Sequence, residues 1–363
     1  MSELKVNSIK GVGASTAAIT VNNTDGTCTA NITNNLSNRN LIINGAMQVA
    51  QRGTSSTGDD YTTVDRYKVA DNGRDEVLTK AQVDVASGTT PYTLGFRKAL
   101  KITNGNQTSG AGAADYVYIH YGFEAQDIAN SGWNYTSSSS YITLSFWVKS
   151  SVAQSFKGYF VSEQGTSSTY GFDTGSLSAN TWTKVTKTIS GNSNLTFNNN
   201  NAKGLTLYLW PYIGTDFTSS STTEDAWATF SSGSRTKDAT STWWTTNDAT
   251  FEITGVQLEV SDHATSFEFL SYADELRRCM RYFQKYTDIR FKHYTDNNFD
   301  NGSFFVMPVA MRSTPTITNN QTVNTNGTVA PANANNLSVF MSLVRSSSGV
   351  QEATFSPTFS SEL

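Results

Sequence analysis

The sequence predicts a mainly β protein whose body is an antiparallel β-sandwich. Three observations support this. Several segments between residues 40 and 268 alternate apolar with polar residues, as half-buried strands do. Clusters of Ser, Thr, Asn and Gly separate these segments and are typical of turns. The single convincing amphipathic helix follows the strands instead of alternating with them, which favours antiparallel over parallel pairing.

The composition limits the classes of function. The chain has 363 residues, so two or three structural units are expected. Charged residues make up only 15% of it, against roughly 25% in an ordinary soluble protein. The aromatic content of 12% excludes a disordered chain, because ample apolar surface is available for burial. The net charge of −4 argues against a nucleic-acid partner, since phosphates are met by a basic surface.

Cys28 and Cys279 are the only cysteines. Neither has a metal-ligand neighbour at Cys-x-x-Cys spacing, and one pair cannot build a disulfide framework. We interpret both as small core residues of a protein made in a reducing cytosol. No charged start leads into an apolar secretion signal. No run of about 18 apolar residues occurs either, so membrane insertion is not expected.

Residues 1–39 consist of short alternating pieces, Leu4–Val6 and Ala18–Val21, broken by glycines and asparagines. The apolar residues are too few to bury a core by themselves. Two interpretations fit: a flexible tail, or a segment that is stabilised when identical chains wrap around one another.

Residues 40–268 carry the strongest strand signal. In three segments, apolar residues occupy every second position. These residues are Val117, Ile119, Tyr121 and Phe123, then Ile142, Leu144, Phe146 and Val148, and finally Leu205, Leu207 and Leu209. In a fourth segment the apolar positions change parity between Ile253 and Val256. We predict a β-bulge there, at Thr254-Gly255, because a bulge accommodates one extra residue.

The run Glu275–Tyr286 predicts the amphipathic helix, with Ser271 as its N-cap and Asp274 three residues later. Its expected apolar face consists of Leu276, Met280 and Phe283, with Cys279 and Tyr272 beside them. After it, Phe304–Pro308 and Val339–Val344 predict further strands. We therefore expect residues 269–363 to form a helix and a small C-terminal β-domain, which packs on the helix or on its counterparts in a trimer.

Several motifs resemble those of bacteriophage tail-fibre and related virion-appendage proteins, in the same order along the chain. The motifs are Asn40–Gly53, Thr63–Tyr67, Tyr141–Ser150, Ile253–Val260, Ala264–Phe269, the helix segment and Met311–Thr316. The resemblance spans about residues 40–318. It implies a jelly-roll β-sandwich over residues 40–268 that is similar to a carbohydrate-binding module. It also implies a virion protein, assembled in the host cytoplasm, with residues 1–39 as an attachment and oligomerisation segment that contacts other virion proteins.

Aromatic rows on the polar side of two strands are the candidate binding sites. Tyr208, Trp210 and Tyr212 alternate with core leucines, and Tyr116, Tyr118 and His120 form a second row. Aromatic faces suit the C–H surface of a sugar ring, while nearby hydroxyl and amide groups take its hydrogen bonds. Trp227 and the pair Trp243-Trp244 are candidate loop platforms, whereas Trp147 is interpreted as structural. The alternative is that a loop, a helix or a neighbouring subunit covers each row.

Metal binding and catalysis have less support. A structural calcium ion is an alternative to having no cofactor, with Asp59-Asp60 and Glu224-Asp225 as loop carboxylates, and no ligand is assigned. No imidazole lies in a recognisable nucleophile motif, and no phosphate loop or zinc signature occurs. Glycoside hydrolysis needs two carboxyl groups that converge in space. The candidates for such a pair are Glu124, Asp127, Glu163 and Asp173.

We expect a non-enzymatic virion fibre, a homotrimer, that binds host-surface polysaccharide during adsorption. Several copies on one particle would raise a modest affinity for each site through multivalency. A purely structural virion component, such as a capsid-decorating fibre or a tail connector, is the first alternative. A polysaccharide depolymerase is the second.

Overall fold

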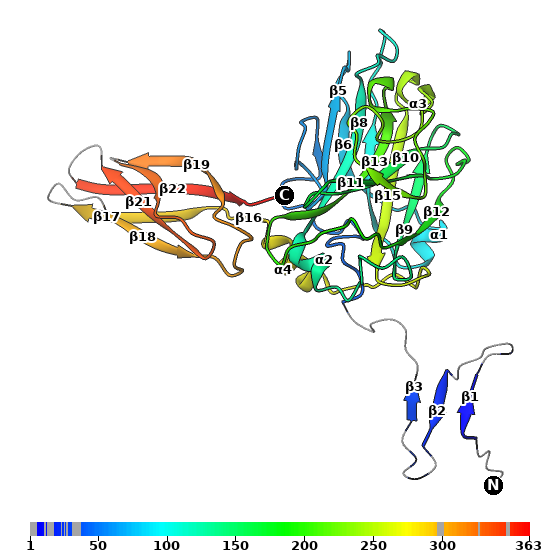
Figure 1. Ribbon diagram of the computed structural model, residues 1–363. Coiled ribbons are helices and arrows are strands. Elements are labelled where there is room, and N and C mark those ends of the chain that lie inside the picture. The colour runs from blue at the N-terminus through cyan, green and yellow to red at the C-terminus, as the bar shows by residue number, and fades with distance from the viewer. Residues whose placement is uncertain are drawn as a thin grey trace. The chain divides into compact units, whose positions relative to one another are not determined.

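The computed structural model divides the chain into two compact units, Met1–Arg39 and Asn40–Leu363 (Figure 1). The residues that it describes are 6–10, 12, 18–22, 24, 26, 28–30, 38–295, 301–325, 327–345 and 349–363. The regions 40–268 and 269–363 therefore belong to one compact unit. The C-terminal region nevertheless has a hydrophobic cluster of its own.

The first unit contains a three-stranded antiparallel sheet, in the order β1 (Ser8–Ile9), β2 (Ile19–Val21) and β3 (Cys28–Ala30). The predicted piece at 18–21 thus forms the central strand. Residues 4 and 5 of the other predicted piece lie outside the described residues, and so does the side chain of Cys28.

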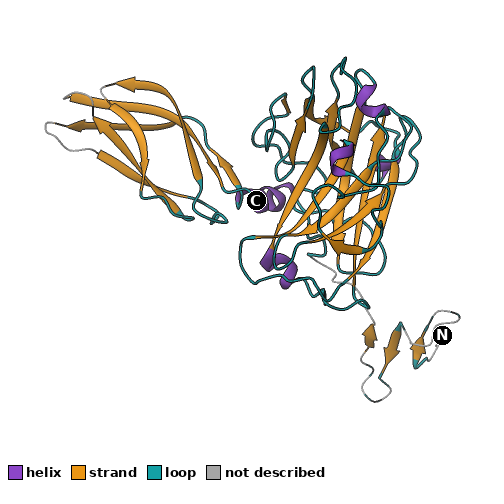
Figure 2. Ribbon diagram, turned by 45° about the horizontal axis from the view of Figure 1, so that its top comes forward, coloured by secondary structure: helices purple, strands orange, loops and turns teal. Residues whose placement is uncertain are grey.

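Two six-stranded antiparallel sheets form the jelly-roll β-sandwich of the second unit (Figure 2). The first sheet has the order β14-β11-β10-β13-β8-β5 and the second the order β12-β9-β15-β7-β6-β4. The first sheet consists of β5 (Lys68–Asn72), β8 (Tyr116–Glu124), β10 (Lys157–Ser162), β11 (Ser168–Asp173), β13 (Lys203–Ile213) and β14 (Trp227–Thr229). The second consists of β4 (Ser55–Ser56), β6 (Thr79–Asp84), β7 (Lys98–Thr103), β9 (Tyr141–Ser150), β12 (Thr183–Ser190) and β15 (Thr250–Glu259).

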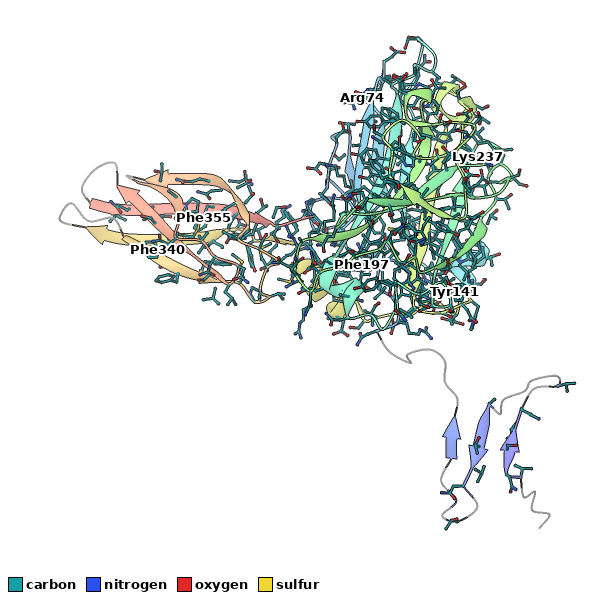
Figure 3. The ribbon with its side chains drawn as sticks, in the orientation of Figure 1. Arg74, Tyr141, Phe197, Lys237, Phe340 and Phe355 are labelled. Atoms are coloured by element: carbon teal, nitrogen blue, oxygen red, sulfur yellow. The ribbon has the colours of Figure 1, made fainter. Side chains whose placement is uncertain are left out.

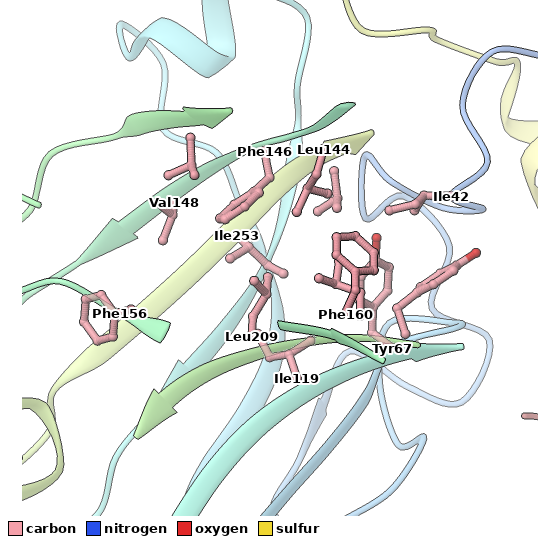
Figure 4. Close-up of a cluster of buried hydrophobic side chains, with 14 of the residues drawn as sticks. Ile42, Tyr67, Ile119, Leu144, Phe146, Val148, Phe156, Phe160, Leu209 and Ile253 are labelled. Atoms are coloured by element: carbon pink, nitrogen blue, oxygen red, sulfur yellow. The ribbon is translucent and has the colours of Figure 1, made fainter. Parts of the chain in front are cut away.

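The core of the sandwich lies between the two sheets, as Figure 4 shows for Leu144, Phe146 and Val148 of β9. These side chains have no exposed surface, and they face residues such as Ile119 of β8 and Leu209 of β13. The alternating apolar residues predicted from the sequence are therefore the inner faces of the strands. Burying each such side chain stabilises the fold by roughly 1.5–3 kcal/mol.

The predicted bulge in β15 is confirmed. Thr254 pairs with Trp147 of β9, but the next partner of β9, Ser145, pairs with Gln257, so β15 carries one extra residue. Gly255 supplies the left-handed backbone that this needs, with φ of +63°. A Cβ atom there would also lie 2.6 Å from the ring of Phe96, so only glycine fits without a shift of that ring.

Four short helical segments lie in the connections of the sandwich. They are α1 (Thr90–Thr93), α2 (Ala125–Ala129), the 3₁₀ helix η1 (Thr215–Phe217) and α3 (Thr242–Thr245).

The amphipathic helix, α4, spans Tyr272–Met280 and begins at the predicted N-cap, where the Ser271 hydroxyl accepts a hydrogen bond from the Asp274 N–H. The prediction that it continues to Tyr286 is wrong. Residues Phe283–Lys285 form the strand β16, because they pair with the strand β22 (Gly349–Ser360) instead of continuing the helix. The buried side of α4 is also displaced from the predicted face. It consists of Glu275 and Cys279, whereas Leu276 and Met280 are half-buried.

The carboxylate of Glu275 is buried because it accepts a hydrogen bond from the Asn44 N–H, in the loop that precedes the sandwich. Tyr272, predicted beside the apolar face, is 56% exposed. The buried side of α4 therefore combines this polar contact with the apolar packing of Cys279 and Leu276 in a cluster with Ile43 and Val49.

The C-terminal region forms two further antiparallel sheets. One joins β16, β22, β17 (Ile289–Thr295) and β19 (Thr316–Thr325), and the other has the order β18 (Asn301–Val306), β21 (Ser338–Arg345) and β20 (Gly327–Ala332). The strands predicted near residues 304–308 and 339–344 are thus observed. Phe355 and Phe359 of β22, together with Met341 and Leu343 of β21, form a buried cluster, and Figure 3 labels Phe355 on this strand.

The end of the chain contacts the sandwich directly. Glu362 forms ion pairs with Arg66, which is 1% exposed, and with Arg52 at 3.1 Å. The Tyr61 hydroxyl donates a hydrogen bond to the Leu363 carbonyl at 2.7 Å. Among the described residues, no helix has the length and apolar character needed to cross a membrane.

Candidate functional site

The outer face of the first sheet collects aromatic side chains from three adjacent strands. Tyr208 of β13 is paired with His120 of β8 on one side and with Tyr159 of β10 on the other. Directly opposed residues point to the same face of a sheet, so these three side chains lie together, away from the core. Both predicted rows contribute to this surface, which we call the aromatic face. Its members are Tyr116, Tyr118, His120, Tyr159, Tyr208 and Trp210.

The rings of the aromatic face pack against one another. Tyr159 and Tyr208 stack with centroids 4.8 Å apart, and Tyr208 stacks on Trp210 at 5.8 Å. Tyr118 meets Tyr208 edge to face at 5.4 Å and stacks on Tyr116 at 5.5 Å. Aromatic pairs in such geometries contribute roughly 0.5–1.5 kcal/mol each beyond the area that they bury. The face is therefore a preorganised surface, held rigid by its own ring contacts.

Exposure divides the aromatic face into two parts. Tyr116, Tyr118 and Tyr208 are half-buried and offer part of each side chain to solvent. Trp210, Tyr159 and His120 are buried, with 1%, 2% and 4% of their surface exposed. Trp210 and His120 were predicted as candidate glycan-binding residues, and this burial contradicts direct contact of either side chain with a glycan.

A loop after β13 explains the burial of Trp210. The Arg235 guanidinium carbon lies 5.9 Å from the centre of the Trp210 ring and 4.8 Å from that of Phe217, which belongs to η1. Phe230 also packs on this cluster. Trp210 therefore supports the tyrosines, while Tyr118 and Tyr208 stay partly open to solvent.

Tyr212 does not belong to the aromatic face, contrary to the prediction. The register between β13 and β8 shifts between Leu209 and Tyr212, so one extra residue on β13 reverses the side on which the chain points. Tyr212 consequently lies in the core of the sandwich, where it stacks on Trp244 with centroids 5.3 Å apart. Simple alternation from Leu209 could not reveal this reversal.

The predicted loop platforms are also corrected. Trp243 and Trp244 are completely buried in the core, and their indole N–H groups donate to the carbonyls of Thr250 and Gly110. Trp227 is half-buried at the edge strand β14, packs on Tyr170 and donates to the Ser190 carbonyl. All three indoles hold loops onto the sandwich, because a buried N–H needs a partner.

Charged and polar groups surround the exposed tyrosines. Glu163 accepts a hydrogen bond from the Thr206 hydroxyl at 2.7 Å and pairs with Lys203 at 3.3 Å, on the side of Tyr208. Lys68, paired directly with His120 in the sheet, forms an ion pair with Asp60 at 3.1 Å. These side chains are partly exposed and can exchange hydrogen bonds with the hydroxyl groups of a sugar.

Burial sets the protonation of the ring groups. It lowers the pKa of His120 to about 3, and the positive charges of Lys203 and Lys68 act in the same direction. It raises the pKa of Tyr118 to about 12 and that of Tyr208 further above its ordinary value. The imidazole is therefore neutral and both phenols are protonated at physiological pH, so the aromatic rings themselves are uncharged.

The loop carboxylates considered for calcium are all engaged by cations. Asp59 pairs with Lys80 at 2.9 Å and Asp60 with Lys68, while Glu224 pairs with Lys157 at 2.8 Å and Asp225 with Lys187 at 3.2 Å. Within the part of the chain that the structure describes, no group of three or more His, Cys, Asp or Glu side chains could hold a metal ion.

Three of the four carboxyl groups considered for hydrolysis also have cationic partners. Glu124 is bound by Arg281, Asp173 by Lys157 at 3.0 Å, and Glu163 by Lys203. Burial, followed by the nearby charge of Glu124, raises the pKa of Asp127.

Sequence reasoning missed Tyr159 of the aromatic face altogether. Its strand reads Lys-Gly-Tyr-Phe-Val-Ser, in which Tyr159 and Val161 alternate with the core residue Phe160, and that alternation was the available signal.

Together, the fold and this surface define a jelly-roll β-sandwich protein with an outward aromatic face on one sheet. No protein-family model matches the chain, and no curated protein matches its sequence.

Three solved structures show a weak similarity to this chain over more than half of its length. The enzymatically active domain of tailspike protein 4 from bacteriophage CBA120 is 11% identical, covers 61% of this chain and has a TM-score of 0.33. The N-terminal cellulose-binding domain of β-1,4-glucanase C from Cellulomonas fimi is 12% identical over 59% of the chain, with a TM-score of 0.29. A putative sugar-binding protein from Bacteroides thetaiotaomicron is 13% identical over 61%, with a TM-score of 0.31.

The chain spans 21% of the tailspike domain, 98% of the cellulose-binding domain and 100% of the putative sugar-binding protein. Because the TM-scores are low, the description of the sandwich rests on the strand pairing of this chain itself.

Proposed function

We propose that this chain is a non-enzymatic bacteriophage virion fibre protein whose sandwich binds host-surface polysaccharide through the aromatic face. The supporting observation is that residues from two separately predicted rows, Tyr118 and Tyr208, meet on one outer surface and remain partly exposed. The ordered tail-fibre motifs over residues 40–318 support the virion role.

Binding would use the exposed parts of the tyrosines together with their polar surroundings. The C–H surface of a pyranose ring packs against Tyr118 and Tyr208, whose rings are already fixed by stacking and so lose little entropy on binding. The phenol hydroxyls, Glu163 and Lys203 then exchange hydrogen bonds with sugar hydroxyls. The affinity of one site is modest, because solvated sugars bury little apolar surface, and repeated copies on a particle raise it.

The proposal includes a homotrimer. Strand β18 lies at the edge of its sheet and exposes 72% of Phe304 and 68% of Val306. Exposed apolar side chains at a sheet edge are typical of a surface that associates with another chain. The first unit attaches the fibre to other virion proteins, and the assembled protein is located on the virion.

A purely structural virion component is the second candidate. Trp210 and Tyr159, which belong to the aromatic face, are already covered within a single chain. If a neighbouring subunit also covers Tyr118 and Tyr208, the whole aromatic face becomes a packing contact and leaves no surface for a glycan.

The test is light-scattering chromatography of host-envelope polysaccharide incubated with the full chain and with a Tyr118→Ala/Tyr208→Ala variant. We expect wild type to co-elute with polysaccharide of unchanged mass and the double variant to elute alone. Tyr141→Ala, which removes a 37% exposed tyrosine from the start of β9, is the matched control and should behave as wild type.

Each other outcome points to a different reading. A fall in polysaccharide mass would identify a depolymerase. Co-elution of the double variant would remove the aromatic face as the binding site, and wild type that elutes alone would favour the structural candidate.

A further inference from the structure

A pocket on the second sheet of the sandwich is not part of the aromatic face that we propose binds polysaccharide. Its volume is about 550 Å³, within the range of roughly 300–1,000 Å³ that small-molecule sites occupy. Its lining residues are Leu94, Phe96, Ser145, Trp147, Lys184, Gly255, Ala264, Thr265, Ser266, Phe267 and Phe269. Ser145 and Trp147 alternate with the core residues of β9, so the pocket lies on the outer side of the second sheet.

The bulge at Gly255 and a folded-back loop shape this pocket. Gly255 presents no side chain to the space, and its neighbour Thr254 is paired with Trp147. The loop that follows β15 is held against the sheet because the Thr265 N–H and hydroxyl both donate to Glu259, at 2.8 and 2.6 Å. The Glu268 N–H donates to Gln257 at 2.8 Å. This loop, which forms one wall of the pocket, is therefore held by hydrogen bonds near both of its ends.

The walls of the pocket are aromatic. Phe96, Phe267 and Phe269 contact one another with centroids 4.8–5.1 Å apart. Phe269 remains 44% exposed and Leu94 52% exposed, while Trp147 is half-buried. An apolar surface that stays open beside a well-packed ring cluster is available to the flat face of a ligand.

One charged side chain lines the pocket, and it is a lysine. Lys184 of β12 lies directly opposite Trp147 of β9 and is exposed, and no ion pair is recorded for it within the described residues. Of the charged groups nearby, Lys149 pairs with Glu252 at 3.0 Å, and the buried Glu259 accepts hydrogen bonds from neutral groups of Thr265 and Gln257. Lys184 is therefore the cation among the residues that line the pocket.

From this geometry we infer that the pocket binds a carboxylated sugar residue of the uronic-acid class. The carboxylate pairs with Lys184, the C–H face of the ring packs against Trp147 and Phe269, and Ser145 offers its hydroxyl group to the sugar. The choice of a saccharide rests on the proposed function, whereas the preference for an anion rests on Lys184 alone. The site is separate from the aromatic face, since it occupies the outer side of the other sheet.

Calorimetric titration of the full chain with tri-galacturonic acid, and with the same trimer as its methyl ester, tests this inference. The ester keeps the ring and removes the charge. We expect the acid to bind wild type more tightly than the ester. Lys184→Gln should weaken binding of the acid about two- to fivefold, within the range for an exposed charged pair, and leave the ester unchanged. Phe269→Ala should weaken binding of both trimers.

Lys187→Gln is the matched control, because it makes the same charge change on the same strand at a residue whose ammonium pairs with Asp225. It should bind both trimers as wild type does. Equal binding of acid and ester by wild type, an unchanged affinity in Lys184→Gln, or no binding of either trimer would overturn the inference.

The Tyr118→Ala/Tyr208→Ala variant separates this inference from the proposed function. If the Tyr118→Ala/Tyr208→Ala variant loses binding of the acid trimer while Lys184→Gln keeps it, the anionic sugar binds at the aromatic face and the pocket proposal fails. If the variant keeps the acid trimer but loses host polysaccharide, the two sites are distinct, as inferred.

Discussion

Arg281 donates two hydrogen bonds to the carboxylate of Glu124, at 2.6 and 2.7 Å, and so connects the end of helix α4 to the last residue of strand β8. The Tyr282 hydroxyl adds a third at 2.7 Å, and the Glu124 side chain has no exposed surface. A fully buried carboxylate is stable only when its oxygens are satisfied in this way. The Arg281–Glu124 pair therefore fixes the position of the chain where it leaves helix α4 and continues into the C-terminal sheets.

Removal of this charge should destabilise the second unit. We expect Glu124→Gln to lower the free energy of unfolding by about 3 kcal/mol, because Arg281 loses its charged partner and one of the two acceptor oxygens is replaced by an NH2 group that cannot accept a hydrogen bond. Urea denaturation of the full chain measures the change. Asp84→Asn, which breaks the exposed Lys98–Asp84 pair, is the control and should cost less than about 1 kcal/mol. Equal losses in both variants would contradict the assigned role.

The same pair predicts a pH effect at acid pH. Burial would raise the pKa of Glu124, but hydrogen bonds from Arg281 and Tyr282 outweigh it and hold that pKa below its ordinary value of 4.5. Its stabilising contribution is therefore present above pH 4.5 and is lost as the pH falls through the folded-state pKa. The difference in unfolding free energy between wild type and Glu124→Gln should shrink below that pH.

His120 predicts a pH effect in a higher window. Its pKa is about 3 when folded and 6.5 in the unfolded chain, so the unfolded state binds the extra proton between these values. The stability that this group contributes is complete above pH 6.5 and falls as the solution becomes more acid. His120→Gln removes the effect. Between pH 7.5 and pH 5, the free energy of unfolding of wild type should fall by about 2 kcal/mol more than that of the variant.

Thermal or urea unfolding of both proteins from pH 5 to 7.5 measures this difference. A difference that does not depend on pH would mean that His120 is not held neutral by burial. The folded protein keeps the His120 imidazole uncharged between pH 5 and 7.5. Titration of His120 should therefore not change the affinity of wild type for polysaccharide over this range.

The bulge in β15 should tolerate no side chain at its glycine. Gly255→Ala introduces a Cβ atom at a φ of +63° and against Phe96, so we expect a loss of about 2 kcal/mol or more. Gly233→Ala is the control, because a Cβ there meets only the Asp216 carbonyl at 3.6 Å and φ is not in the left-handed region. Denaturation midpoints compare the two, and similar values would contradict the bulge geometry.

Trp210 and Tyr208 should differ in what their removal changes. Trp210→Ala deletes a fully buried side chain and should cost about 3–5 kcal/mol of stability. Tyr208→Ala removes a half-buried ring and should weaken polysaccharide binding with a smaller loss of stability. Denaturation paired with co-elution on each variant checks this. A stable Trp210→Ala protein with impaired binding would reverse the assignment.

Local pattern was sufficient wherever one residue's neighbours in the sequence decide its environment. The alternation in Ile142–Val148, the parity change at Thr254-Gly255 and the Ser271 N-cap all depend on periodicity or on backbone groups a few residues away. These features predicted the mainly β fold, the bulge and the start of the helix. The same alternation placed Tyr118 and Tyr208 outside the core.

Pattern failed where a partner far along the chain decided the outcome. Trp210 is buried because a loop with Phe217 and Arg235 folds over it, and Tyr212 turns inward because of a register shift against β8. Helix α4 ends at Met280 because Phe283–Lys285 pairs with β22, more than 70 residues later in the sequence. The two strand pairings join segments more than 70 residues apart. The cover on Trp210 depends on how the loop that carries Phe217 and Arg235 folds back, which the alternation within β13 does not contain.

By itself, then, the sequence determined the core faces of the regular strands, the turns and the outward direction of Tyr118 and Tyr208, because side-chain direction follows the two-residue period of a strand. Only the tertiary structure decided which aromatic residues solvent reaches, that Tyr159 joins the aromatic face, and that Trp147 and Lys184 share a pocket. Those outcomes depend on strand register and loop packing, in which residues distant in sequence compete for the same surface.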